Sequence, residues 1–177
     1  SYPPLSIIAS SGQTVWLAGV LMLGASSTLL SLTILATIVA YRAPGLTLLR
    51  LPFFVWAQAV TALLLLLSFP PLQAAAVFQL MDRVAGTSFF LPSGLAVSNT
   101  PLAVSGGGNP LLWQHLFWFL AHPEVYVLVL PAMGIVAEVL TSHARRNLWR
   151  YGLMVAAVVG LGAWSMVVWA HHMYLTG

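Results

Sequence analysis

Long apolar stretches separated by short polar segments dominate this chain. Four of them reach the roughly 20 residues that a helix needs to cross a bilayer. They run about 14–41, 51–81, 110–140 and 149–174. We therefore predict an all-α fold, a polytopic bundle with four membrane-spanning helices. Pro70-Pro71 is expected to kink the second helix, because proline removes a backbone donor.

Composition supports a membrane protein and narrows its chemistry. Hydrophobic residues make up 60% of the 177 residues and charged residues only 5%, against roughly 25% in a soluble domain. The net charge of +3 comes from six arginines, too little basic surface for nucleic-acid binding. The absence of cysteine excludes disulfides, iron–sulfur clusters and thiolate copper sites. A metal here would need imidazole, carboxylate or phenol ligands.

The arginines predict the orientation in the membrane. Arg42 and Arg50 lie in the loop after the first span, and three more lie between residues 141 and 150. Two spans separate these loops, so they share one face, which the positive-inside rule makes cytoplasmic. Both ends of the chain, which we interpret as a fragment, then face outward. The adjacent Asp82 and Arg83, at the end of the second span, are expected to form a salt bridge at the membrane surface.

The third span carries three chemically active groups near its middle, in the stretch Trp113–Tyr126 (WQHLFWFLAHPEVY). An ionisable side chain in hydrocarbon costs at least ~2.5–3.5 kcal/mol, so Glu124 is expected to have a function. His122 and Tyr126 are four residues apart and share a helix face. Glu124 points elsewhere, about 200° around the helix from His122.

Two further histidines, His171 and His172, lie near the outer end of the fourth span. If the third and fourth spans are antiparallel neighbours, these side chains reach the same depth as His122. Adjacent helical side chains diverge by about 100°, so both reach one ion only at a helix end or where the backbone is loosened. Three neutral imidazoles suit copper, among other metals. Buried histidines bonded to neighbouring carbonyls are the alternative.

The segments WQHLFWFLAHPEVYVLVLPAMGIV and VWAHHMYLTG resemble the copper-site helices of haem–copper oxidase subunit I, the catalytic subunit of cytochrome c oxidase. YPPL, LPFFVWA and GTSFF also occur in the family's order. The resemblance covers essentially the whole chain. It implies that residues 1–177 form a partial subunit I domain, the fourth to seventh of twelve core helices.

The resemblance implies roles for individual residues. It assigns the active-site copper to His122, His171 and His172. Tyr126 is the expected redox tyrosine, cross-linked to His122, and Glu124 the expected proton-gating carboxylic acid.

Further residues take supporting roles by the same resemblance. Trp118 is expected beside the copper and Val125 along the oxygen route. Ser26 and Ser27 resemble proton-channel serines, and Thr33 stands where the family often has asparagine.

The implied activity is that of a respiratory terminal oxidase, which reduces dioxygen to water with proton translocation. Expected partners are the rest of subunit I, subunits II and III, membrane lipid, and cytochrome c or quinol as electron donor. The haem groups would be ligated outside this chain, so the fragment alone is expected to be inactive. The expected location is a bacterial plasma membrane.

Two other functions compete with this interpretation. A nitric oxide reductase relative would share the three histidines but lack the tyrosine at position 126. A non-redox, proton-conducting membrane protein would use Glu124 as a relay beside a structural metal.

Overall fold

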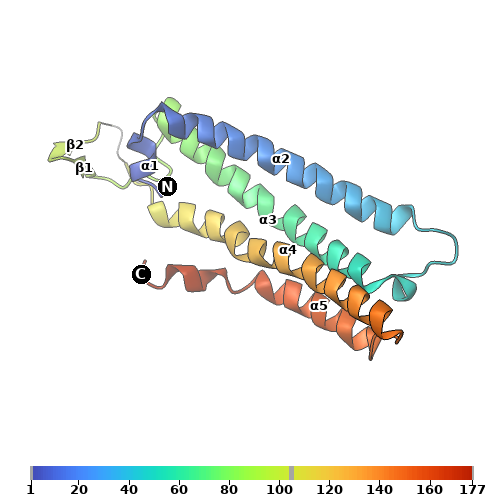
Figure 1. The fold of residues 1–177 in the computed structure, drawn as a ribbon. Helices are drawn as coiled ribbons and strands as arrows, with labels where there is room; N and C mark the ends of the chain where they lie inside the picture. The colour runs from blue at the N-terminus through green and yellow to red at the C-terminus, as the bar shows by residue number, and fades with distance from the viewer. Residues whose placement is uncertain (1, 104–105, 177) are drawn as a thin grey trace.

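The fold is known from a computed structural model that describes residues 2–103 and 106–176. Helices account for most of these residues (Figure 1). In chain order the elements are α1 (Leu5–Ile8), α2 (Ser11–Ala40), the 3-10 helix η1 (Leu48–Arg50), α3 (Phe53–Val84), strands β1 (Ala96–Val97) and β2 (Thr100–Pro101), α4 (Pro110–Ala144), α5 (Tyr151–Ser165) and the 3-10 helix η2 (Trp169–Met173).

The predicted all-α membrane bundle is confirmed. Within the described residues, four helical segments are long and apolar enough to cross a membrane: α2, α3, α4, and α5 together with η2. Helices α3 and α4 extend past the predicted ends of their spans, to Val84 and Ala144. A helix can continue beyond the apolar stretch because its backbone hydrogen bonds do not depend on apolar side chains. Helix α3 also runs without interruption through Pro70 and Pro71, which membrane helices tolerate.

The fourth span is not the single helix that the sequence predicted. Helix α5 ends at Ser165, and a short turn leads into η2. The amides of Met166 and Val167 donate to carbonyls three residues back, those of Ala163 and Trp164. Bonds of this i to i−3 type tighten the chain into 3-10 geometry and end the regular α-helix. The backbone is therefore loosened just before the two neighbouring histidines.

Helix α3 lies at the centre of the bundle and packs against α2, α4 and α5 (Figure 1). The hydrophobic core joins α3, α4 and α5. Its buried members are Phe53, Val60, Leu64, Leu130, Val155 and Val158. Both described chain ends and the β1–β2 hairpin lie at one end of the bundle, and the α2–α3 and α4–α5 connections lie at the other (Figure 1). The two arginine-bearing loops thus share one face, as the sequence predicted.

Asp82 does not pair with Arg83, so the expected salt bridge is wrong. The buried Asp82 carboxylate instead accepts hydrogen bonds from the Thr87 hydroxyl at 2.6 Å and from the Phe89 and Phe90 amides at 2.8 and 2.9 Å. A carboxylate that accepts several backbone N–H groups at the end of a helix fixes the loop that supplies them. Asp82 therefore anchors the start of the long loop between α3 and α4.

The Arg83 guanidinium fixes the N-terminal segment in the same way. It donates to four backbone carbonyls of that segment, at 2.7 to 3.1 Å. The acceptors are Ser6, Ile7, Ala9 and Ser10. The two charged side chains at the end of α3 thus bind two different backbone segments, because loop amides attract the carboxylate and carbonyls attract the guanidinium.

The loop between α3 and α4 packs closely on itself where it enters α4. Phe90 and Leu91 are buried, and the Leu91 carbonyl accepts from the amide of Gly108 at 3.0 Å. A Cβ atom at Gly108 would lie 1.9 Å from the Ser88 carbonyl oxygen, so only glycine fits there. The next residue, Asn109, caps α4 by accepting from the Leu111 amide. The loop therefore fixes where α4 begins.

Glycine at position 162 permits the close approach of α5 to α3. A Cβ atom at Gly162 would lie 2.4 Å from Cγ1 of Val60, whose χ1 angle is stiff. We expect Gly162→Ala to lower the stability of the intact subunit by about 1–3 kcal/mol, the usual cost of overpacking. The midpoint of heat unfolding in detergent measures this loss of stability.

Gly160→Ala is the matched control, because a Cβ atom there meets nothing within 4 Å. It should leave the unfolding midpoint unchanged or raise it slightly, since alanine has the higher helix propensity. Equal midpoints for the two variants would contradict the packing described between α3 and α5.

Candidate metal centre

Helix α4 supplies one histidine of the candidate centre and the aromatic residues beside it. His122 is buried, with 7% of its surface exposed. Trp118 and Tyr126, four residues before and after it, lie on the same helix face. The Tyr126 ring lies next to the His122 ring, with 5.6 Å between the centroids. Helix α4 passes through Pro123 without a break, so this face is continuous.

The other two histidines come from η2. This 3-10 helix packs against α4 and carries His171 and His172, whose ring centroids are 4.2 Å apart. Two ring contacts hold η2 on α4: Trp169 packs edge-on against Phe119, and the His172 ring stacks on Trp118 at 3.9 Å with only 7° between the planes. These contacts orient the histidine pair toward His122.

The three imidazoles converge on one point. One ring nitrogen from each of His122, His171 and His172 lies within 4.8 Å of the others. Nδ1 of His122 lies 3.0 Å from Nε2 of His172. Two nitrogens at about 2.0–2.1 Å from a tetrahedral metal are about 3.4 Å apart. The cluster therefore fits a metal ion after small adjustments of the rings.

The second nitrogen of two of these rings also bears on whether the cluster is a metal site. Nδ1 of His171 donates to the carbonyl of Val168, since a carbonyl can only accept. A ligating histidine usually donates its second N–H in this way, which fixes the ring and leaves the other nitrogen for the metal. Nε2 of His122 is buried and has no hydrogen-bond partner among the described side chains. The alternative of a histidine bonded to a neighbouring carbonyl therefore does not describe His122 among the described residues.

The three histidines differ in how far the described chain covers them. His122 is buried, whereas His171 and His172 are exposed in the described chain. Val125, which the family resemblance places on the oxygen route, is 52% exposed.

Glu124 lies on a different face of α4 from the histidine cluster. Its side chain is exposed. In the described part of the chain, no hydrogen bond or ion pair joins Glu124 to Ser26 or Ser27, which lie on α2. The Thr33 hydroxyl, also on α2, donates to the Leu29 carbonyl at 2.9 Å. The structure thus gathers the three histidines, Trp118 and Tyr126, and it leaves Glu124 and the α2 hydroxyl groups apart from them.

One residue near the centre was not identified from the sequence. Nδ1 of His115 accepts a hydrogen bond from the Trp169 indole N–H at 3.4 Å, which ties η2 to α4 outside the histidine cluster. The spacing carries a weak signal for this contact, because His115 lies seven residues, about two helical turns, before His122. The partner on η2 could not be inferred without knowing where α5 ends.

Comparisons with known proteins agree on one family. The family model described as cytochrome C and quinol oxidase polypeptide I matches residues 1–177. The chain is 44% identical over 181 residues to alternative cytochrome c oxidase subunit 1 of Bradyrhizobium diazoefficiens. It is 45% identical over 178 residues to cytochrome c oxidase subunit 1 of Cereibacter sphaeroides, and 40% identical over 178 residues to that of Bacillus subtilis.

These alignments cover 99%, 99% and 100% of this chain, but only 30%, 29% and 27% of the relatives. The chain therefore spans less than a third of the length of the curated relatives it matches. The described chain forms a membrane bundle that brings three histidines together, and the family model matches all 177 residues. The chain therefore belongs to the cytochrome c and quinol oxidase polypeptide I family.

Proposed function

We propose that this chain is the copper-site portion of the catalytic subunit of a respiratory terminal oxidase, which reduces dioxygen to water and translocates protons. The observation that carries the proposal is the convergence of His122, His171 and His172, with one nitrogen from each within 4.8 Å of the others. Family membership supports it. The proposed complex contains the rest of subunit I together with subunits II and III. Its electron donor is cytochrome c or quinol, the two classes in the family description.

The three imidazoles are proposed to hold the active-site copper. When bound, copper supplies one-electron and dioxygen chemistry. His122 is held by the helix and by burial, His171 by its bond to Val168, and His172 by its stack on Trp118. The haem groups are proposed to bind through residues outside this chain.

Tyr126 is the proposed redox residue, cross-linked to His122. Support comes from the adjacent rings and from Nε2 of His122, which is buried and without a partner among the described side chains. Because Nδ1 lies 3.0 Å from Nε2 of His172, we assign Nδ1 to the metal, which leaves Nε2 for the proposed bond to Tyr126. Tyr126 would supply an electron and its phenolic proton. This phenol favours an oxidase over a nitric oxide reductase relative.

Glu124 is the proposed proton-gating acid. Its place about 200° around α4 from His122 separates the proton donor from the metal face. Ser26, Ser27 and Thr33 on α2 are proposed to line the channel that supplies the proton, with water bridging the distance to Glu124. Val125 is proposed to line the oxygen route. Family membership supports these assignments.

Substitution of a ligand tests the metal proposal. In the intact oxidase, His122→Asn should lower the copper content by one ion per subunit I, because two imidazoles on η2 alone bind copper weakly. His143→Asn is the matched control, since His143 lies on the same helix but is exposed and bonds only to the Val139 carbonyl. Metal analysis of the purified complex measures both. Full copper content in His122→Asn would refute the shared site.

Removal of one hydroxyl tests the role of Tyr126. Tyr126→Phe should retain copper but reduce oxygen consumption by at least ~100-fold, because the phenolic proton and the oxidisable ring are lost. Tyr41→Phe, at an 80% exposed position at the end of α2, should keep the activity of the parent enzyme. Oxygen-electrode measurements compare the two variants. Normal oxygen reduction by Tyr126→Phe would remove the proposed redox role.

A neutral isostere tests Glu124. Glu124→Gln keeps the size and hydrogen-bonding capacity of the side chain but cannot release a proton. In the intact enzyme it should leave the copper content unchanged and slow proton-coupled turnover by about 10²–10⁴-fold. Stopped-flow proton uptake and metal analysis on the same preparation separate the two effects. Unchanged proton uptake would show that the proton takes another route.

The proposed location is a bacterial plasma membrane, with the arginine-bearing loops in the cytoplasm. Support comes from the shared face of these loops and from the bacterial relatives. In intact cells, a cysteine introduced at exposed Ser98 should react with an impermeant reagent, whereas one at exposed Ser142 should not. Reaction at both positions, or only at Ser142, would overturn this orientation.

A further inference from the structure

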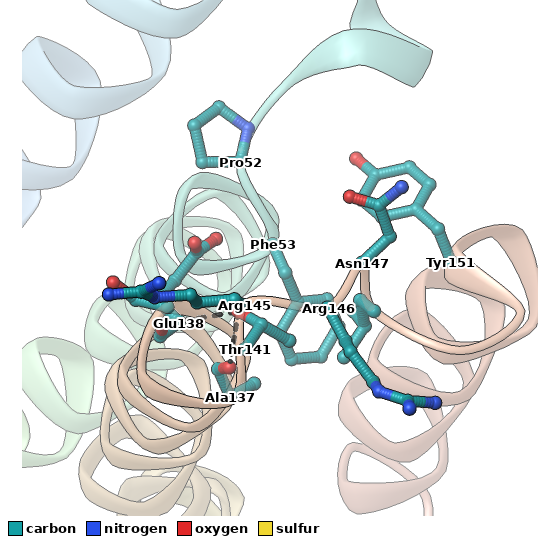
Figure 2. Close-up of a pocket in the computed structure, with 11 residues that line it drawn as sticks. Pro52, Phe53, Ala137, Glu138, Thr141, Arg145, Arg146, Asn147 and Tyr151 are labelled. Atoms are coloured by element: carbon teal, nitrogen blue, oxygen red, sulfur yellow. Dashed lines mark hydrogen bonds between the residues drawn. The ribbon is translucent and has the colours of Figure 1, made fainter.

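Both ends of helix α5 are fixed relative to α3. Tyr151 lies in the first turn of α5, and its hydroxyl donates to the Leu51 carbonyl just before α3 (Figure 2). Near the other end of α5, Gly162 lies so close to Val60 that a Cβ atom would not fit between them. A helix fixed at both ends does not slide or rotate freely. The residues that end α5 therefore determine where the chain goes next, which is into η2 and its two histidines.

The hydroxyl of Ser165 takes the place of a backbone amide where α5 ends. In a regular α-helix, the amide of Met166 would donate to the carbonyl of Gly162, four residues back. Here the buried Ser165 hydroxyl donates to that carbonyl at 2.7 Å, and the Met166 amide donates to the Ala163 carbonyl instead. Serine side chains compete with the backbone for hydrogen-bond acceptors in this way. Competition for the Gly162 carbonyl thus accounts for the change from α-helical to 3-10 geometry at this point.

A buried serine in the middle of α2 shows that such a bond need not end a helix. The Ser31 hydroxyl donates to the Ser27 carbonyl, four residues back, at 2.7 Å. In a regular helix that carbonyl accepts from the amide of Ser31 itself, so the hydroxyl displaces no other residue. The Ser165 hydroxyl reaches only three residues back, to the carbonyl that the next amide would otherwise use. The reach of the side chain therefore distinguishes Ser165 from Ser31.

A second buried hydroxyl holds the first residue after α5. The hydroxyl of Ser68, on α3, donates to Sδ of Met166 at 3.5 Å. Only 1% of the Ser68 surface is exposed. Because this bond joins two different helices, it fixes the residue at the break relative to the central helix of the bundle. A thioether sulfur is a weak acceptor, so we expect this bond to contribute less than the bond of Ser165.

We infer that Ser165 and Ser68 are positioning residues of the candidate metal centre. Ser165 ends α5 before η2 begins, and Ser68 holds Met166 between the two. Both serines lie outside the cluster of imidazoles, so they act through the backbone that carries His171 and His172. If α5 continued as a regular helix, these adjacent side chains would diverge by about 100°. The inference rests on the proposed metal site, and it names the residues that bring two of the three ligands together.

Copper retention by the intact oxidase tests this inference. The copper ion to follow is the one that His122→Asn lacks, and its release to excess EDTA is timed by metal analysis. Ser165→Ala should release this ion about 10-fold faster, at the lower end of the 10–100-fold loss of metal affinity that follows removal of a residue supporting a ligand. Ser31→Ala is the matched control, because it also removes a buried hydroxyl that bonds to its own helix, and it should leave the release rate unchanged.

Electron cryo-microscopy of the same variants separates a positioning role from a general loss of stability. In Ser165→Ala the next amide should donate to the Gly162 carbonyl, so that α5 extends and the two histidine rings of η2 no longer both face His122. In Ser31→Ala the three rings should keep their places. Unfolding midpoints of the two variants should be similar, because each loses one buried hydroxyl.

Ser68→Ala provides a second test, which holds even if Ser165→Ala does not assemble. It should release copper about threefold faster than the parent enzyme, a smaller effect because the lost bond is to a weak acceptor. Met166→Leu removes the acceptor and keeps a side chain of similar volume, so it should have the same effect as Ser68→Ala.

Two results would overturn the inference. The first is copper release from Ser165→Ala and Ser68→Ala at the rate of Ser31→Ala. The second is a structure of Ser165→Ala in which α5 still ends at residue 165 and η2 keeps its place. Full copper content in His122→Asn would instead refute the proposed metal site, and the structure of Ser165→Ala would then still decide whether Ser165 positions η2.

Discussion

Adjacent histidines can serve one metal only if the backbone that carries them leaves the α-helix. Side chains at consecutive helical positions diverge by about 100°, so His171 and His172 on a regular helix would point at different neighbours. Helix α5 ends at Ser165, and the 3-10 helix η2 lays both rings against α4. The early end of α5 is therefore the feature on which the candidate centre depends.

Two sets of contacts make this broken helix a fixed structure. Close packing at Gly162 sets the approach of α5 to α3 just before the break, and the Val60 side chain fills the space that a Cβ would need. After the break, aromatic rings of α4 hold η2: Trp118 stacks on His172, and Phe119 packs against Trp169. Helix α3 thus positions α5, and α4 positions η2. The loop that Asp82 anchors in turn fixes where α4 begins.

Much of this could be predicted from the sequence, because apolar length determines where a helix can span and i, i+4 spacing determines which side chains share a face. These rules predicted the four spans and the shared face of His122 and Tyr126. They did not predict the end of α5, because residues 149–174 remain apolar where the helix stops. The pairing of Asp82 with loop amides was also missed, since it depends on the path of residues 87–90. The places of Glu124 and Ser26 relative to each other depend on neighbouring helices, which local patterns do not describe.

An experimental structure of the intact oxidase, with anomalous diffraction recorded at the copper absorption edge, tests the central claim most directly. The account predicts one anomalous peak within about 2 Å of a ring nitrogen of each of His122, His171 and His172. A copper peak elsewhere with none at these three rings, or rings of His171 and His172 that point into different helix interfaces, would contradict it.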